Sequence, residues 1–245
     1  MSVTRPRRRV SVVGILGELF ITAGILVLLF LGWQVWLGNL IEGNEQRSDA
    51  ETQSQAWNKG GSSAPAPTDR PDPGEPVVAA APGNAVTFAN LIIPRFGVDY
   101  TRPIAQGIGV RDVLEYGVGH YPSSVMPGAI GNTAYAAHRT GAGSPFFDVD
   151  KLQVGDSIYV ETEDGWYQYR MRSLEYVQPT GVGVLLPVPQ APGVEATERI
   201  LTLTSCNPVF TASERIIVYA VFETWYPRDG GAPAELAPLN ATAAG

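Results

Sequence analysis

A long apolar run close to the N-terminus constrains this chain more than any other feature. From Leu19 to Leu37 the run is interrupted only by Thr22, Gln34 and small residues. About 20 such residues, rising 1.5 Å each, cross a hydrocarbon core about 30 Å thick, so the run is long enough for a transmembrane helix. The sequence therefore predicts a single membrane span, which we assign to residues 19–41.

The charges around this run predict its orientation. Arginines precede it at Arg5, Arg7, Arg8 and Arg9, and almost no positive charge follows it closely. By the positive-inside bias, residues 1–18 stay in the cytoplasm and the remainder of the chain lies outside the cell. A cleaved signal peptide is the alternative, but the run is longer than a typical signal-peptide core and no Ala-x-Ala-like site follows promptly. We expect a single-pass protein of the cell membrane with an extracellular domain.

The composition divides the extracellular part into three segments. Residues 42–84 are polar and rich in Ser, Ala, Gly, Gln and Pro. Such a stretch buries too little apolar surface to offset its ordering, so we expect a flexible tether. Residues 228–245 have a similar composition and are expected to be a disordered tail. One folded domain over residues 85–227 lies between them.

Short β-rich segments alternate with turn signals inside that domain. The strands that we expect are residues 86–93, 157–162, 166–172, 199–205 and 215–225. Only residues 110–116 have a helical pattern. Many short strands with little helix predict an all-β barrel or sandwich.

The net charge of −7 excludes one large class of partner. Nucleic-acid binding needs a cationic face for the phosphates, and basic residues are scarce beyond the extreme N-terminus. The His, Cys and carboxylate residues show no spacing typical of metal ligands, so we expect no metal and no other cofactor.

Cys206 is the only cysteine and therefore cannot form an intramolecular disulfide. It follows the strand-like residues 201–205 and precedes Asn207-Pro208, where regular strand pairing must stop. A buried free cysteine is the more common outcome for such a residue. A thiol with a pKa near 8.5 becomes a nucleophile when a histidine or a positive charge lies beside it.

Three residues could supply that neighbour. His138 ends another strand-like run, His120 lies in a glycine-rich loop, and Arg215 opens the last β-rich segment. If that segment forms a hairpin with the one before it, Arg215 lies beside Cys206 and can donate two hydrogen bonds to an oxyanion. A surface histidine and a strand-edge arginine are the simpler interpretations.

These segments together resemble the sortase family. Residues 202–206, Thr-Leu-Thr-Ser-Cys, resemble the sortase signature Thr-Leu-x-Thr-Cys. The upstream Ala136-Ala137-His138-Arg139 and the later Arg215 match the other two conserved segments of that family in the same order. The resemblance extends over about residues 85–225.

The resemblance implies an eight-stranded β-barrel with one or two short helices, preceded by the single transmembrane helix. It further implies a transpeptidase in which Cys206 cleaves the Thr–Gly bond of a Leu-Pro-x-Thr-Gly-like sorting signal on a surface protein and forms a thioacyl intermediate. An amine of a peptidoglycan precursor or of a pilin then takes the acyl group. In that scheme His138 is the general acid and base, and Arg215 holds the oxyanion.

The resemblance is greatest to class E sortases, with class D as the near alternative. In class E, a tyrosine at the position of Tyr121 is associated with preference for Leu-Ala-x-Thr-Gly. We expect the substrate to meet Tyr121, His120, Thr204 and Ser205. Ser205 stands where the family usually has threonine.

Other functions remain as alternatives. Pilin-linking sortases usually carry an Asp-Pro-aromatic lid anchor and a second span, but Asp72-Pro73 is followed by Gly74 and no second apolar run is present, which favours wall anchoring. A membrane-tethered β-module that binds wall polymer or protein without catalysis is a second class of function. An L,D-transpeptidase would resemble Ser-x-Gly-Cys at its nucleophile, which residues 204–206 do not match.

Overall fold

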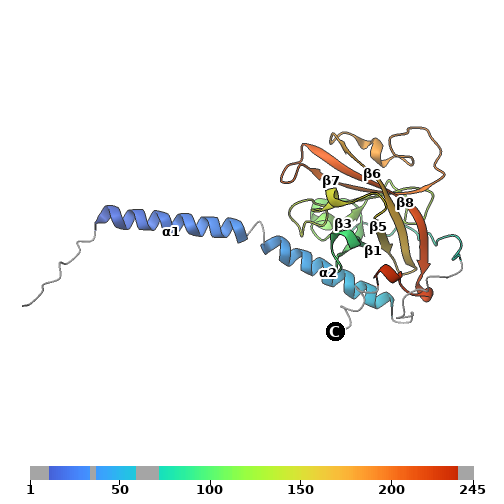
Figure 1. Ribbon diagram of the computed structural model, residues 1–245, viewed down its shortest axis with the longest axis horizontal. Helices are drawn as coiled ribbons and strands as arrows, with labels where there is room; N and C mark the ends of the chain where they lie inside the picture. The colour runs from blue at the N-terminus through green and yellow to red at the C-terminus, as the bar shows by residue number, and fades with distance from the viewer. Residues whose placement is uncertain (1–10, 34–36, 59–71, 237–245) are drawn as a thin grey trace, which may run out of the picture.

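A computed structural model of the protein describes residues 11–33, 37–58 and 72–236. Two helices precede a β-barrel (Figure 1). The helices are α1 (Val12–Gly32) and α2 (Gly38–Trp57). The strands are β1 (Thr87–Ile92), β2 (Thr101–Gln106), β3 (Val118–His120), β4 (Gly131–Ala136), β5 (Ser157–Glu161), β6 (Gly165–Val177), β7 (Arg199–Asn207) and β8 (Glu214–Pro227).

The eight strands close into a barrel in the order β1-β2-β3-β4-β7-β8-β6-β5. The β2–β3 and β4–β7 pairs are parallel, and the other pairs are antiparallel. The prediction of an eight-stranded barrel with few helices is confirmed. The helix expected at residues 110–116 is a single π-helical turn, Val110–Leu114.

The barrel interior is filled by alternate residues of the strands, as the two-residue period of a β-strand requires. Leu201 and Leu203 of β7 and Ile216 and Val218 of β8 belong to one large buried cluster. The opposite face of the same two strands carries a smaller cluster, whose members are Val184, Ile200, Ile217 and Tyr219. Both faces of the β7–β8 pair are therefore packed, which fixes the position of the strand ends.

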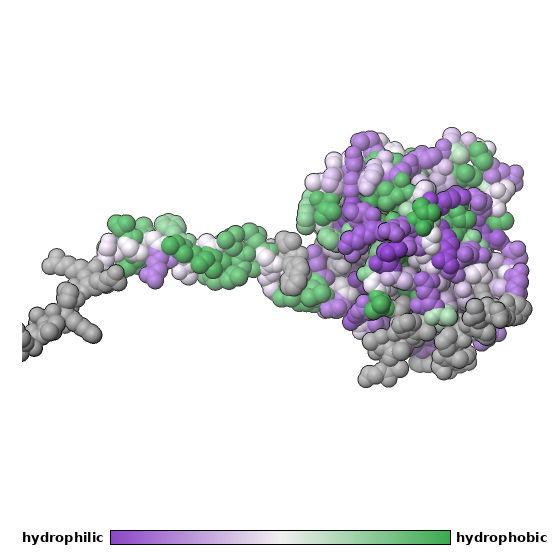
Figure 2. Space-filling view, in the orientation of Figure 1, coloured by the Kyte–Doolittle hydropathy of each residue, from purple (hydrophilic) through white to green (hydrophobic). Residues whose placement is uncertain are grey.

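Helix α1 extends away from the barrel, and none of its residues is buried (Figure 1). Within the described residues it is the one helix that is long and apolar enough to cross a membrane. Figure 2 shows its mostly hydrophobic surface beside the mixed surface of the barrel. The helix begins earlier than the predicted span of residues 19–41, and by Gly38 the chain has already entered α2.

Helix α2 differs from the flexible tether predicted for residues 42–84. It packs beside β2 and buries Gly43, Gln46 and Ala50, which lie on one face of the helix. A Cβ atom on Gly43 would lie 3.3 Å from the carbonyl oxygen of Gly143, so the small residue allows a close approach. The sequence did not predict this helix because the stretch is polar and few large apolar side chains pack against the barrel.

The remainder of the predicted tether is only partly described. Residues 59–71 lie outside the described residues. Beyond them, the carbonyl of Gly74 accepts a hydrogen bond from Trp225 Nε1 at 3.1 Å, and the carbonyl of Val77 accepts one from Tyr167 at 2.6 Å. This segment is therefore held against the barrel.

The predicted disordered tail also begins as ordered structure. Residues 228–236 form two short 3-10 turns, and Ala232 and Leu236 pack in a buried cluster with Ile92, Tyr159 and Trp166. Residues 237–245 lie outside the described part of the chain.

Candidate active site

The C-terminal end of β7 holds Cys206 opposite an arginine. In the antiparallel β7–β8 pair, Cys206 is the direct partner of Arg215. Cys206 is a free, half-buried cysteine, and Arg215 is also half-buried. The hairpin that the sequence predicts therefore forms, and it brings these two residues together beside the loop that joins its strands.

His138 reaches the same place through the parallel β4–β7 pair. The register pairs Ala136 with Thr204, and Ala137 continues it by donating from its N–H to the carbonyl oxygen of Thr204 at 3.3 Å. If this register is continued for two residues beyond the Ala136–Thr204 pair, His138 falls opposite Cys206. His138 is half-buried, so its ring remains accessible. The three predicted catalytic residues thus lie at one end of three neighbouring strands.

The guanidinium of Arg215 is oriented by the backbone that enters β8. Its Nη1 donates to the carbonyl oxygens of Ala212 at 3.1 Å and Glu214 at 2.9 Å. Within the described residues, Nε and Nη2 donate no hydrogen bond. These two nitrogens carry three N–H groups, so Arg215 keeps donors for an oxygen that develops negative charge beside Cys206.

A polar network built on the buried Arg139 lies next to the three candidate residues in the sequence, and sequence reasoning missed it. Arg139 is 4 % exposed, pairs with Asp150 at 3.0 Å and donates from Nη1 to Oδ1 of Asn207. Asn207 in turn donates to Glu214 at 3.0 Å. The network joins the residue after His138, the residue after Cys206 and the residue before Arg215. The sequence signal for this network was the His138-Arg139 pair in the segment that resembles the family. The contacts of Arg139 could not be predicted, because they are made with residues far away in the sequence.

Tyr121 lies near the thiol on the outer face of β7. Its hydroxyl is 2.9 Å from Oγ1 of Thr204, and either atom can be the donor. Because side chains alternate along a strand, Thr204 and Cys206 face the same side. Tyr121 is half-buried, so a substrate chain on this face can meet it.

The other residues expected to bind substrate are buried. Thr204 is 5 % exposed and Ser205 is 4 % exposed, and Ser205 Oγ donates to the carbonyl of Ala137 at 2.8 Å. His120 is 1 % exposed, with its Nδ1 2.7 Å from Gln106 Oε1 and its Nε2 3.0 Å from the carbonyl of Val125. Burial keeps these three residues from a substrate chain, and Tyr121 is the accessible one of the four.

Burial also affects the protonation of His120. Removal of the ring from water lowers the pKa of His120, and the hydrogen bond to the Val125 carbonyl opposes that shift. Burial therefore favours the neutral form of this ring. Among the described residues, no group of three or more His, Cys, Asp or Glu side chains is arranged to hold a metal ion.

Comparison with known proteins identifies the family of this barrel. The family model for the sortase domain matches residues 91–223, which is more than half of the chain. The chain belongs to the sortase family. Sortase SrtE1 of Streptomyces coelicolor is 38 % identical over 228 residues, which cover 90 % of this chain and 60 % of that protein. The chain therefore spans less than two thirds of that relative's length.

Solved sortases have the same barrel. SrtA from Actinomyces oris is 36 % identical and superposes with a TM-score of 0.63, covering 67 % of this chain and 94 % of that one. Sortase E1 from Streptomyces coelicolor, solved with a tripeptide in its active site, is 41 % identical with a TM-score of 0.58, covering 64 % of this chain and 99 % of that one.

The relatives also separate the two classes that the sequence suggested. Sortase D of Bacillus subtilis is 27 % identical over 132 residues, which cover 53 % of this chain. Both the identity and the coverage are lower than for the sortase E relatives. Class E is therefore supported over class D for this sortase.

Proposed function

We propose that this sortase is a membrane-anchored cysteine transpeptidase that transfers surface proteins to an amine of a peptidoglycan precursor. The observation that carries the proposal is the strand register, which pairs Cys206 with Arg215 across β7–β8 and ends β4 at Ala136, opposite Thr204 of β7, two residues before His138 and Cys206. A nucleophile, a proton-transfer group and an oxyanion donor thus meet where three strands end.

In the first half of the reaction the thiolate of Cys206 attacks the threonine carbonyl of a Thr–Gly bond. The carbonyl oxygen becomes an oxyanion, which the free N–H groups of Arg215 stabilise. The intermediate collapses when the C–N bond breaks, and His138 protonates the departing glycine amine. A thioacyl group remains on Cys206.

In the second half an amine replaces the thiol. His138 removes a proton from the incoming amine, the C–N bond forms and the C–S bond breaks. The new amide leaves, and Cys206 is ready for another signal. Proton transfer by a well-positioned group contributes about 10²–10⁴-fold to such a rate.

Tyr121 is our candidate for recognition of the sorting signal. Its hydroxyl contacts Thr204, which faces the same side of β7 as Cys206. The class E resemblance associates a tyrosine here with Leu-Ala-x-Thr-Gly. We therefore propose that Leu-Ala-x-Thr-Gly is cleaved faster than Leu-Pro-x-Thr-Gly.

The proposed location follows from α1 and the arginines before it. The apolar helix would span the cell membrane, and the four arginines ahead of it would keep the N-terminus in the cytoplasm. The barrel would then lie outside the cell. Protease added to intact cells should remove the barrel, and full protection would contradict this topology.

The deciding experiment uses the full chain in detergent micelles, because α2 packs against the barrel and a shortened domain would lose it. The chain is incubated with either peptide and an amine, and the products are followed by mass spectrometry. Cleavage between Thr and Gly, with a thioacyl adduct on Cys206, is expected, and Cys206→Ala should abolish both. A folded chain that cleaves neither peptide and resists alkylation at Cys206 would instead favour the non-catalytic β-module.

A further inference from the structure

The first half of helix α2 touches the part of the barrel that carries the catalytic candidates. Glu42 Oε2 accepts a hydrogen bond from the N–H of Gly143 at 2.8 Å, in the loop that follows His138. This loop leaves β4 at the end of the barrel where β7 ends and β8 begins. We call this end, which carries His138, Cys206 and Arg215, the catalytic end of the barrel.

The last residues of α2 lie at the opposite end. Asn58, which caps the helix, accepts a hydrogen bond from Arg228 Nη1 at 2.7 Å. Strand β8 begins at the catalytic end and finishes at Pro227, so Arg228 lies at the far end of the barrel. From Glu42 to Asn58 the helix rises about 24 Å. Helix α2 therefore follows the side of the barrel from the catalytic end to the far end.

The catalytic end is also the end that is nearest to the apolar helix along the chain. Five residue steps lead from Trp33, which caps α1, to Gly38, where α2 begins. Each residue spans at most about 3.6 Å, so these two residues are no more than about 18 Å apart. If α1 spans the bilayer, the first turn of α2 lies close to the lipid surface, and Arg228 lies at the end of the barrel that points away from it.

The side chains of α2 favour a helix that leaves the bilayer over one that lies flat on it. Leu40 and Ile41, in its first turn, are exposed. Residues 42–56 contain no large apolar side chain, and they begin with the charged Glu42. A helix that lies in the interface needs an apolar face along its length. Contact between α2 and lipid is therefore limited to the first turn.

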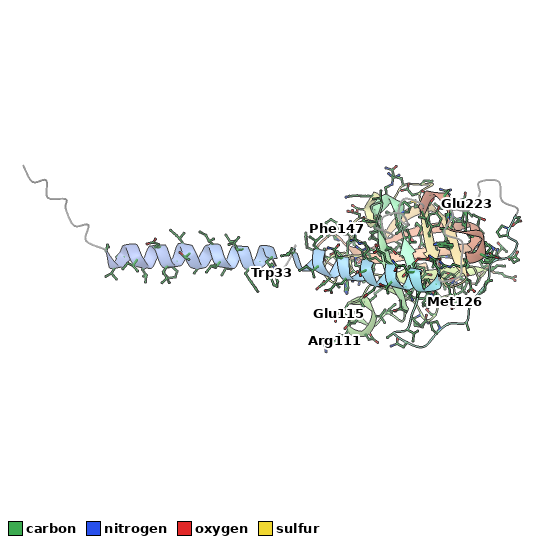
Figure 3. The ribbon with its side chains drawn as sticks, turned by 90° about the horizontal axis from the view of Figure 1, so that it is seen from below. Trp33, Arg111, Glu115, Met126, Phe147 and Glu223 are labelled. Carbon is green, nitrogen blue, oxygen red and sulfur yellow. The ribbon has the colours of Figure 1, made fainter. Side chains whose placement is uncertain are left out.

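Exposed aromatic side chains gather at the catalytic end. Phe147 is exposed in the loop that follows His138, and Figure 3 shows it on the side of the barrel that faces α1, with Glu223 farther away. Phe210 is exposed in the loop between β7 and β8. Both loops belong to the catalytic end, so these two rings are presented on the same side as the first turn of α2.

Two further exposed aromatic residues lie at this end. Tyr116 follows the π-helical turn, which accepts a hydrogen bond from Gln46 Nε2 of α2 at 3.5 Å. Tyr176 of β6 precedes the residue that pairs with Arg215. Among the described residues after Trp33, no other Trp, Tyr or Phe is exposed. Aromatic side chains are enriched where proteins meet the membrane–water interface, so the catalytic end suits a lipid surface.

We propose that the barrel stands on the bilayer with its catalytic end toward the lipid, and that Leu40 and Ile41 lie in the interface. The inference rests on the proposed function and location, and it adds the direction in which the site opens. The partner is a phospholipid surface. Substrates that are themselves anchored in the membrane then reach Cys206 without passing along the height of the barrel.

The test measures the height of two labelled positions above the bilayer. The full chain with Cys206→Ala is reconstituted in phosphatidylcholine vesicles that carry an acceptor dye on their headgroups. A donor dye is attached through Ser213→Cys, in the loop between β7 and β8, or through Glu163→Cys, in the turn between β5 and β6. Both native residues are exposed, and the carbonyl of Glu163 accepts a hydrogen bond from Arg228 Nε at 3.3 Å, which places it at the far end.

The dye at position 213 should lie roughly 20 Å nearer to the lipid than the dye at position 163, because α2 separates the two ends by about that length. Energy transfer from position 213 should therefore be several times as efficient. Equal transfer from the two positions, or more transfer from position 163, would overturn the inference.

A second comparison tests the contact with lipid. Leu40→Ser/Ile41→Ser removes the apolar side chains of the first turn, so the difference in transfer between the two dyes should fall by about half as the barrel tilts more freely. The matched control is Val182→Ser/Val194→Ser, which removes two exposed apolar side chains from the loop between β6 and β7 and should leave the difference unchanged. A difference that survives in the first variant would overturn the contact through Leu40 and Ile41.

The dyes report on height without any turnover, so the inference and the proposed enzymatic activity fail separately. A native chain that cleaves soluble peptide, together with equal transfer from the two dyes, would retain the enzyme and reject the orientation. A native chain that cleaves no peptide, together with the expected difference in transfer, would retain the orientation and reject the enzyme.

Discussion

Two arginines at opposite ends of β8 are used in different ways. Arg228 follows the last residue of the strand, and its Nη1 donates to Glu161 at 2.9 Å and to Asn58 at 2.7 Å, while its guanidinium lies 4.1 Å from the ring centroid of Trp166. Arg215 is the second residue of the strand and, in the described part of the chain, donates only from Nη1, to backbone carbonyls. An arginine whose donors are all directed inward stabilises a structure, whereas one that keeps free donors is available to a substrate.

The partners of Arg228 extend this contrast. Glu161 is 2 % exposed, and its two carboxylate oxygens also accept hydrogen bonds from Ser54 at 2.7 Å and Asn90 at 3.1 Å. The ion pair thus joins the end of β8, strand β5 and helix α2. At the Cys206 end of the barrel, by contrast, the catalytic candidates are half-buried and open to solvent.

The largest expected effect comes from breaking the buried pair. Arg228→Ala would leave Glu161 buried without its cation, and loss of one partner of such a pair costs about 3–5 kcal/mol. We expect the free energy of unfolding to fall by that amount, measured by urea denaturation of the full chain. The fraction that remains folded should still cleave peptide.

Arg172→Ala is the matched control for stability. Arg172 pairs with Glu198 at 3.2 Å, but both side chains are about half exposed. Exposed pairs contribute about 0–1 kcal/mol, so this variant should unfold almost as the native chain does. Equal losses in the two variants would show that Arg228 has no special structural role.

The second prediction concerns the other end of the strand. Arg215→Ala should lower kcat by about 10²–10³-fold, or about 2.7–4 kcal/mol, because the oxyanion loses its donors. The thermal midpoint should change little, since only two hydrogen bonds to backbone carbonyls disappear. Peptide cleavage and thermal unfolding of the same preparation separate these two effects.

Arg215→Lys sharpens this prediction. Lysine keeps the positive charge but lacks the planar fork that can hold the Ala212 and Glu214 carbonyls and a substrate oxygen together. Its kcat should therefore fall nearly as far as that of the alanine variant. Full activity in Arg215→Lys would mean that charge alone is needed, and a large loss of stability in Arg215→Ala would assign the residue to folding.

The comparison also explains which parts of this molecule a sequence can reveal. The β7–β8 hairpin was predictable because both strands have a local β-rich pattern and the turn between them is short. That hairpin alone brings Cys206 and Arg215 together. The parallel pairing of β4 with β7 joins segments far apart in the chain and was not predicted. Only the family resemblance indicated that His138 and Cys206 belong to one site.

Helix α2 could not be predicted because its stability comes from distant partners. Its buried face consists of Gly43, Gln46 and Ala50, which give no apolar signal. Asn90 and Glu161, which hold its second half, belong to β1 and β5. His120 was expected to meet the substrate because a glycine-rich loop suggests an exposed ring. In the structure, Gln106 on β2 and the Val125 carbonyl enclose the ring, and both partners are distant from the local sequence pattern.

The smallest expected effect tests the structural side of the comparison through pH. Burial lowers the pKa of His120 in the folded chain, so the unfolded chain binds more protons once the pH falls below the ordinary histidine pKa of about 6.5. Stability is therefore complete above that pH and declines below it, by at most about 1.4 kcal/mol per pH unit for one group.

Urea unfolding of the native chain and of His120→Gln between pH 7.5 and pH 5 measures this decline. Glutamine can keep a hydrogen bond to Gln106 or Val125 but does not titrate, so the variant should lose less stability as the pH falls. Asp156, whose pKa is lowered by its hydrogen bond to Arg95, responds only near the ordinary aspartate range close to pH 4, below this window. Parallel pH profiles in the two proteins would mean that His120 takes up a proton without leaving its place, and that its burial between Gln106 and Val125 does not depend on a neutral ring.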